Sequence, residues 1–169
     1  MATKKGAKAS KTATKKTVKS ISSKGPAKSA KPGATKKPSS DALLFHAMYL
    51  MAVIDGTTSS SELHVLEALL TSLPEFSASS ISELVAESKA IVKKYGGTID
   101  SLEALADVDG MKARIKCFLL ATEVAYASGG IGKAEAALLE TLAKLLDLDK
   151  SVTKSIVTVL TYKYQDVRG

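Results

Sequence analysis

Apolar residues recur three and four positions apart from residue 41 onward, and short runs of turn-forming residues separate them. This spacing gathers apolar side chains on one face of an α-helix. The pattern predicts helices over residues 41–54, 59–73, 80–95, 101–107, 111–126, 133–146 and 151–164. Because only short turns join these segments, the sequence predicts an all-α fold, an antiparallel bundle of six or seven helices.

Capping residues stand at the predicted helix boundaries. Residues 59–62 and 80–83 are Ser-x-x-Glu capping boxes, in which a hydroxyl and a carboxylate accept hydrogen bonds from free backbone N–H groups. Residues 100–103 offer the same arrangement with Asp in first position, and Ser40 or Asp41 can cap the first helix. Three helices are expected to end at Asp55-Gly56, Gly96-Gly97 and Gly129-Gly130.

The same periodicity predicts which side chains point inward. We expect one face of each helix to pack in the core and the opposite face to meet solvent. The expected core residues are Leu44, Met48, Met51, Leu63, Leu66, Leu69, Leu70, Leu73, Leu84, Ile91, Val92, Ile115, Phe118, Leu119 and Tyr126. The single cysteine, Cys117, lies within an apolar pattern, which favours a small buried hydrophobe over a reactive thiol.

An internal repeat relates residues 55–73 to residues 128–146 at an offset of 73 positions. The matching pairs are Gly56 with Gly129, Glu62 with Glu135, Leu66 with Leu139, Glu67 with Glu140 and Leu69 with Leu142, and Ala52 matches Ala125 in the preceding helices. The repeat predicts a bundle built from two related helical hairpins.

Charge divides the chain into two parts. Residues 1–40 contain 12 of the 24 Lys and Arg residues and none of the 17 Asp and Glu residues, so they carry +12 and residues 41–169 carry −5. Residues 1–40 have almost no large apolar side chains, and three prolines interrupt them, so burial cannot offset the entropy of ordering this segment. We therefore expect a disordered tail over residues 1–40 and a helical domain over residues 41–169.

The tail repeats Ala-Thr-Lys-Lys at 2–5, 13–16 and 34–37, and its composition resembles the tails of linker histones and lysine-rich bacterial nucleoid proteins. Lysines without arginine or aromatic neighbours attract phosphates but do not read bases. We expect binding to DNA or another polyanion, without sequence specificity, through Lys4, Lys5, Lys8, Lys11, Lys15, Lys16, Lys19, Lys24, Lys28, Lys31, Lys36 and Lys37. The alternatives are binding to an anionic membrane surface and a tail that only solubilises the protein.

The sequence contains no recognisable catalytic signature. It lacks a nucleophile elbow, Cys/His zinc spacing and a phosphate-binding glycine loop. His46 and His64 are interpreted as surface or boundary histidines. No apolar stretch is long enough to span a bilayer, and no hydrophobic segment precedes residue 41. We expect a non-enzymatic cytoplasmic protein that associates with the nucleoid, with an organelle transit peptide as an alternative interpretation of the tail.

Two carboxylates flank the first turn between helices. Asp55 ends one helix and Glu62 lies in the first turn of the next, so the tight turn can bring the two groups together. Ca²⁺ and Mg²⁺ prefer such oxygen ligands. The alternative is structural: Asp55 braces its turn, Gly56 adopts a positive φ, and Glu62 completes the capping box.

The segment Met51-Ala-Val-Ile-Asp-Gly-Thr-Thr-Ser-Ser-Ser-Glu62 and its echo Val124-Ala-Tyr-Ala-Ser-Gly-Gly-Ile-Gly-Lys-Ala-Glu135 resemble the Asp-Gly-x-x-x-x-x-Glu segments of TerB-like tellurite-resistance domains. The resemblance covers residues 41–165. It implies a helical bundle of two related halves, acidic residues suspected of binding metal, and a bacterial role in stress response and phage defence.

The chain departs from the family pattern at two places. Ser128 stands where the second segment should have an aspartate, and residues 57–61 lack the additional acids common in the family. The resemblance therefore implies a weak divalent-cation site for Ca²⁺ or Mg²⁺, with Asp55 and Glu62 as the main candidates and Glu135 as a third. No cofactor is expected to be required.

Two functions remain open from the sequence. In the first, the lysine tail tethers a helical domain to a polyanion, and that domain self-associates or recruits a protein partner. In the second, the protein is a TerB-like stress-response or metal-responsive module that the tail only localises. An enzyme with an unrecognised site and a structural role in a larger particle are further alternatives.

Overall fold

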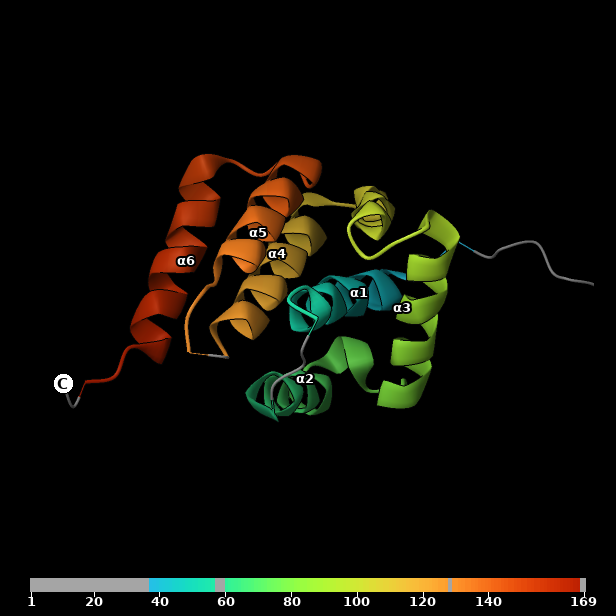
Figure 1. The fold of residues 1–169 in the computed structure, drawn as a ribbon, viewed down its shortest axis with the longest axis horizontal. Helices are drawn as coiled ribbons and strands as arrows, with labels where there is room; N and C mark the ends of the chain where they lie inside the picture. The colour runs from blue at the N-terminus through green and yellow to red at the C-terminus, as the bar shows by residue number, and fades with distance from the viewer. Residues whose placement is uncertain (1–36, 57–59, 128, 168–169) are drawn as a thin grey trace, which may run out of the picture. The chain divides into compact units, whose positions relative to one another are not determined.

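The computed structural model describes residues 37–56, 60–127 and 129–167. Every regular element among these residues is helical, which confirms the all-α prediction (Figure 1). The elements are α1 (Ser40–Val53), α2 (Ser60–Ser72), the 3-10 helix η1 (Pro74–Phe76), α3 (Ile81–Tyr95), the 3-10 helix η2 (Asp100–Asp107), α4 (Met111–Tyr126), α5 (Lys133–Leu145) and α6 (Lys150–Tyr164).

Helix α1 lies at the centre of the fold, between α3 on one side and α4 on the other (Figure 1). Its side chains are buried around the whole circumference, from Ala42 to Ala52, with Tyr49 alone half-exposed. The expectation of a single inward face was wrong here, because α1 carries apolar residues on all sides and a helix of that kind is surrounded by others. Ser39 caps the helix, with its hydroxyl accepting a hydrogen bond from the Ala42 backbone N–H at 3.2 Å.

Helix α4 is the second core helix and packs against α1, α5 and α6. Its bounds agree with the predicted range, but its inward face is different. Phe118 is buried as expected, whereas Ile115, Leu119 and Tyr126 are only half-buried. The unbroken run from Leu120 to Ala125 is buried instead, because three helices surround this part of α4.

The helix ends confirm part of the capping analysis. At the start of α3, Ser80 and Glu83 form the predicted capping box, and Gly96 ends the helix in the left-handed region at φ 87°. The segment after it is a 3-10 helix, η2, and no side chain caps it, so the cap predicted at Asp100 was wrong. The predicted capping box at residues 59–62 begins outside the described residues.

Both predicted hairpins are present, and their helices lie at equivalent positions of the sequence repeat. Helices α2 and α5 both have 13 residues, and their bounds differ by the same 73 positions that relate the sequence repeats. Helices α1 and α4 also end 73 positions apart. The glycines of the two turns, Gly56 and Gly129, both have a positive φ. The two halves therefore share the length of the second helix and the positive φ of the glycine in the turn.

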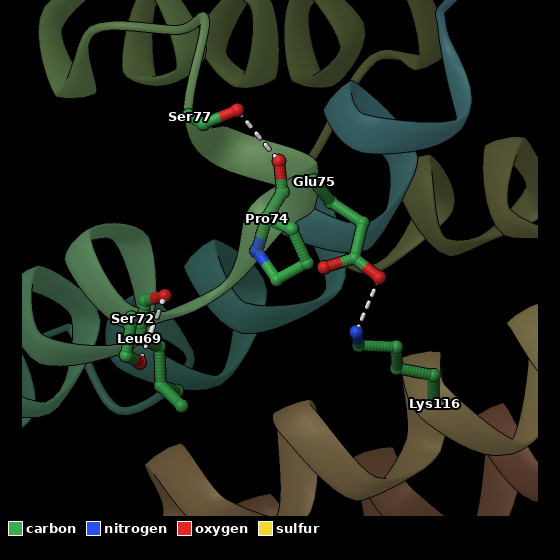
Figure 2. Close-up of polar contacts among 6 residues, drawn as sticks. All are labelled: Leu69, Ser72, Pro74, Glu75, Ser77 and Lys116. Atoms are coloured by element: carbon green, nitrogen blue, oxygen red, sulfur yellow. Dashed lines mark hydrogen bonds and ion pairs between the residues drawn. The ribbon is translucent and has the colours of Figure 1, made fainter.

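The short helix η1 is tied to the core by an ion pair across the fold. Glu75 of η1 accepts from Lys116 of α4, and the Ser77 hydroxyl donates to the Pro74 carbonyl at 2.8 Å (Figure 2). Phe76 is buried, and its ring makes an edge-to-face contact with the ring of Phe45 at a centroid distance of 6.5 Å. Helix α2 is thereby connected to α3 through a segment anchored on both α1 and α4.

The described helices include none that is both long enough and apolar enough to cross a bilayer.

Candidate functional site

The three candidate metal ligands lie at the turns of the two hairpins. Asp55 is exposed in the turn that follows α1. Glu62 and Glu135 occupy equivalent positions in the first turns of α2 and α5, and both are buried, with 3% and 7% of their surface exposed. Carboxylates are common in the first turn of a helix, but charged side chains are rarely as deeply buried as these two. The repeat thus places a matched pair of buried acids at one end of the two hairpins.

The carboxyl group of Glu135 is buried and is also affected by the charges of the other two acids. Burial raises the pKa of the Glu135 carboxyl above its usual value, and the hydrogen bond that it accepts from the Gly132 backbone N–H at 2.5 Å opposes this effect. The negative charges of Glu62 and Asp55 raise the pKa further. Side chains from both hairpins therefore contribute to one region of negative potential.

This region is not a ready-made metal site. Within the part of the chain that the structure describes, no three His, Cys, Asp or Glu side chains are arranged so that they could hold a metal ion. Residues 57–59 and Ser128, which belong to the two turns, lie outside the described residues.

The predicted polyanion-binding lysines fall almost entirely outside the described residues. Lys37 is the exception. It is exposed and forms an ion pair of 3.5 Å with Asp107 at the end of η2. Both side chains are at least half exposed, so the pair contributes little to stability. The contact shows that the acidic body can receive a lysine from the segment preceding α1.

The histidines do not share one environment. His64 is exposed on α2, as expected, but His46 is fully buried in α1, so its interpretation as a surface or boundary residue was wrong. Burial lowers the pKa of His46 to about 4 and outweighs the opposing hydrogen bond between Nε2 and the Ser101 carbonyl at 3.3 Å. His46 is therefore neutral at pH 7 and is a core residue.

Cys117 is buried, as the sequence predicts. Burial raises the pKa of its thiol to about 12, so the thiolate that a nucleophile requires is scarce at neutral pH.

The sequence did not predict one polar cluster, which lies between α4 and α6. Glu123 of α4 has only 8% of its surface exposed and accepts from Lys163 of α6. Beside it, the rings of Tyr126 and Tyr164 stack at 5.9 Å, and the Tyr126 hydroxyl lies 2.6 Å from that of Thr161. No repeat partner signals this cluster, because residue 50, the equivalent of Glu123, is a leucine. The contacts fasten α6 to α4.

The comparisons with known proteins identify one family. The model of the family described as "Tellurite resistance protein TerB" matches residues 42–156, which is more than half of the chain. No curated protein matches the chain. No solved structure matches it either.

Proposed function

Because the chain belongs to the TerB tellurite-resistance family, we propose that it is a non-enzymatic binding protein whose lysine tail tethers the helical TerB domain to DNA or a similar polyanion. The observation that carries this proposal is the separation of charge: residues 1–40 carry +12 and residues 41–169 carry −5. A dense array of lysines binds phosphates by releasing counterions and needs no defined geometry.

The chemistry of the helical domain supports a binding role over catalysis. The thiol of Cys117 is buried with a raised pKa, and His46 is buried and neutral. Neither side chain can meet a substrate from solvent. The domain body is acidic, so phosphate polymers repel it, and attraction to DNA has to come from the tail. In this arrangement the tail supplies attachment and the helical domain is held at the polyanion to meet a partner.

A mobility-shift experiment over a salt series tests the tethering. The full chain is compared with residues 36–169, a truncation that keeps Ser39 and hence the cap of α1. We expect the full chain to bind duplex DNA of unrelated sequences equally, with a salt slope no steeper than about −11 for twelve lysines. The truncated chain should not bind. Equal binding by both chains, or a strong preference for one sequence, would contradict the proposal.

A second function is favoured by the acids of the two hairpins: a divalent cation bound at Asp55, Glu62 and Glu135 would make the domain cation-responsive. The supporting observations are the matched positions of Glu62 and Glu135 and the raised pKa of Glu135. Burial is the main cause of the raised pKa, and the negative charges of Glu62 and Asp55 add a repulsion that a cation would relieve. Such a site draws its ligands from both repeats, so binding would couple the α1–α2 turn to the α4–α5 turn.

Calorimetry with Ca²⁺ and with Mg²⁺ tests this second function. We expect saturable heat with the wild-type chain and its loss in Asp55→Ala and Glu135→Gln. Glu140→Gln, which removes an exposed acid one turn further along α5, is the matched control and should leave the heat unchanged. No heat from the wild type, or the same heat from all variants, would rule the site out.

A further inference from the structure

A groove with a volume of about 500 Å³ opens between α5 and α6. Both helices pack on α4, which contributes Phe118 to the lining of the groove. Phe118 of α4 and Leu139 of α5 are buried and line the floor, and half-buried Ile131, Leu148 and Val157 line the sides. The volume is within the range of small-molecule sites, which are mostly apolar with a few polar groups at fixed positions.

The polar groups of this groove are mainly basic. Lys144, Lys150 and Lys154 line it, and Glu140 is the one acid among its lining residues. Glu140 is already engaged by Lys144 at 2.7 Å. In the described part of the chain, Lys150 and Lys154 form no ion pair. An apolar trough lined by three lysines and one glutamate is unexpected on a body whose net charge is −5.

From this geometry we infer that the groove binds a single-chain anionic amphiphile, a long-chain carboxylate. The hydrocarbon chain lies along Phe118, Leu139 and Val157, and the carboxylate meets the ammonium groups of Lys150 and Lys154. Burial of the hydrocarbon chain provides affinity. The two lysines, which lie one helical turn apart on α6, favour a negatively charged headgroup.

The size of the groove favours a hydrocarbon chain over a docked helix. A helix with its side chains is about 10 Å across, so roughly one turn would fill the groove. A single turn makes too few contacts to dock a helical partner, which normally uses anchors over at least two turns. A flexible chain can follow the trough instead.

Fluorescence titration of the full chain tests this inference, with dansyl-labelled undecanoic acid as the probe below its micelle concentration. We expect saturable binding with a blue-shifted emission. Unlabelled dodecanoate should displace the probe, and dodecyltrimethylammonium, which has the same chain and the opposite charge, should not.

Matched variants separate the groove from the lysine tail, which is identical in all of them. Lys150→Gln/Lys154→Gln should weaken binding about tenfold. Lys89→Gln/Lys93→Gln removes two exposed lysines with the same spacing from α3 and should leave the affinity unchanged. Equal weakening in both pairs would show that only overall charge matters and would overturn the inference.

A second pair tests the apolar part of the site. Ala136 and Ala137 are adjacent exposed residues of α5, but only Ala136 lines the groove. Ala136→Phe should reduce probe binding, and Ala137→Phe should not. Identical behaviour of the two variants, or displacement of the probe by dodecyltrimethylammonium, would also overturn the inference.

Discussion

At the scale of single residues, the burial of polar side chains has the most direct consequences. His46 is fully buried in α1, and its Nδ1 atom has no hydrogen-bond partner among the described residues. A neutral imidazole tolerates this environment better than an imidazolium does, because burial penalises the charged form. The folded state therefore resists protonation of His46, and stability becomes linked to pH.

The sign of this linkage gives the first prediction. The pKa of His46 is about 4 in the folded protein and 6.5 in the unfolded chain. As the pH falls from 6.5 toward 4, the unfolded chain binds a proton that the folded protein does not, so the free energy of unfolding falls. The loss from this residue is at most about 3 kcal/mol.

Urea unfolding of wild type and His46→Leu at pH 7 and pH 4.5 measures this contribution. We expect the variant to lose less stability than the wild type between the two pH values. His64→Gln, at the exposed histidine, should lose as much as the wild type. If His46→Leu loses as much stability as the wild type between the two pH values, burial does not lower the pKa of His46 in the folded protein.

At the scale of helices, burial distinguishes α1 from α2 more sharply than their sequences do. Leu50 in α1 has no exposed surface, whereas Leu63 in α2 is 45% exposed. We expect Leu50→Ala to lower the free energy of unfolding by about 2–5 kcal/mol, since it removes core contacts and leaves a cavity. Leu63→Ala should cost less than about 1 kcal/mol. Thermal and urea unfolding of both variants measure the difference, and equal losses would contradict the assigned burial of α2.

The capping box of α3 gives a prediction of its own. Ser80 accepts a hydrogen bond from the Glu83 backbone N–H, and Glu83 accepts one from the Ser80 backbone N–H at 3.1 Å. Ser80→Ala should cost about 1 kcal/mol, because it leaves a backbone donor of the first turn without its partner. Ser155→Ala is the control: this exposed serine of α6 bonds only within its own helix, and its loss should be nearly neutral. Urea unfolding of both variants would show whether the cap contributes.

The sequence predicted the helices well because the signals that mark their ends are local. Ser80 with Glu83, and the glycine at position 96, act within a few residues of themselves. The cap expected at Asp100 failed for a tertiary reason: the segment packs against α1, α3 and α5 as a 3-10 helix, in which the cap hydrogen bond does not form. The burial of α1 on all sides also depends on its neighbours, which a single-helix pattern does not reveal.

At the scale of the whole molecule, the duplication made part of the candidate site predictable. Glu62 and Glu135 were recognised as equivalent from their positions in the repeat, and both are indeed buried in the first turns of matching helices. Their shared electrostatic environment could not be predicted, because it depends on how the two hairpins pack. The groove between α5 and α6 was missed because it depends on how these two consecutive helices pack on α4, which the sequence pattern does not reveal.

The charge separation between tail and body gives the last prediction, which concerns copies of the chain meeting each other. The acidic body already receives Lys37 at Asp107, and eleven further lysines precede this residue in a segment without acids. When no polyanion is present, the tail of one molecule can bind the body of another. Such contacts are between exposed charges, so they depend on screening: the Debye length falls from about 30 Å at 0.01 M ionic strength to about 3 Å at 1 M.

Sedimentation velocity over a range of protein concentrations measures this association. We expect the sedimentation coefficient of the full chain to rise with concentration at about 0.01 M ionic strength and to be constant at about 1 M. Residues 36–169 should sediment as a monomer in both conditions, because these shortened chains carry −3 each and repel each other. Replacement of the tail lysines by glutamine in the full chain should have the same effect as truncation. Association that survives high salt, or that persists without the tail, would point to an apolar interface on the helical domain instead of charge pairing.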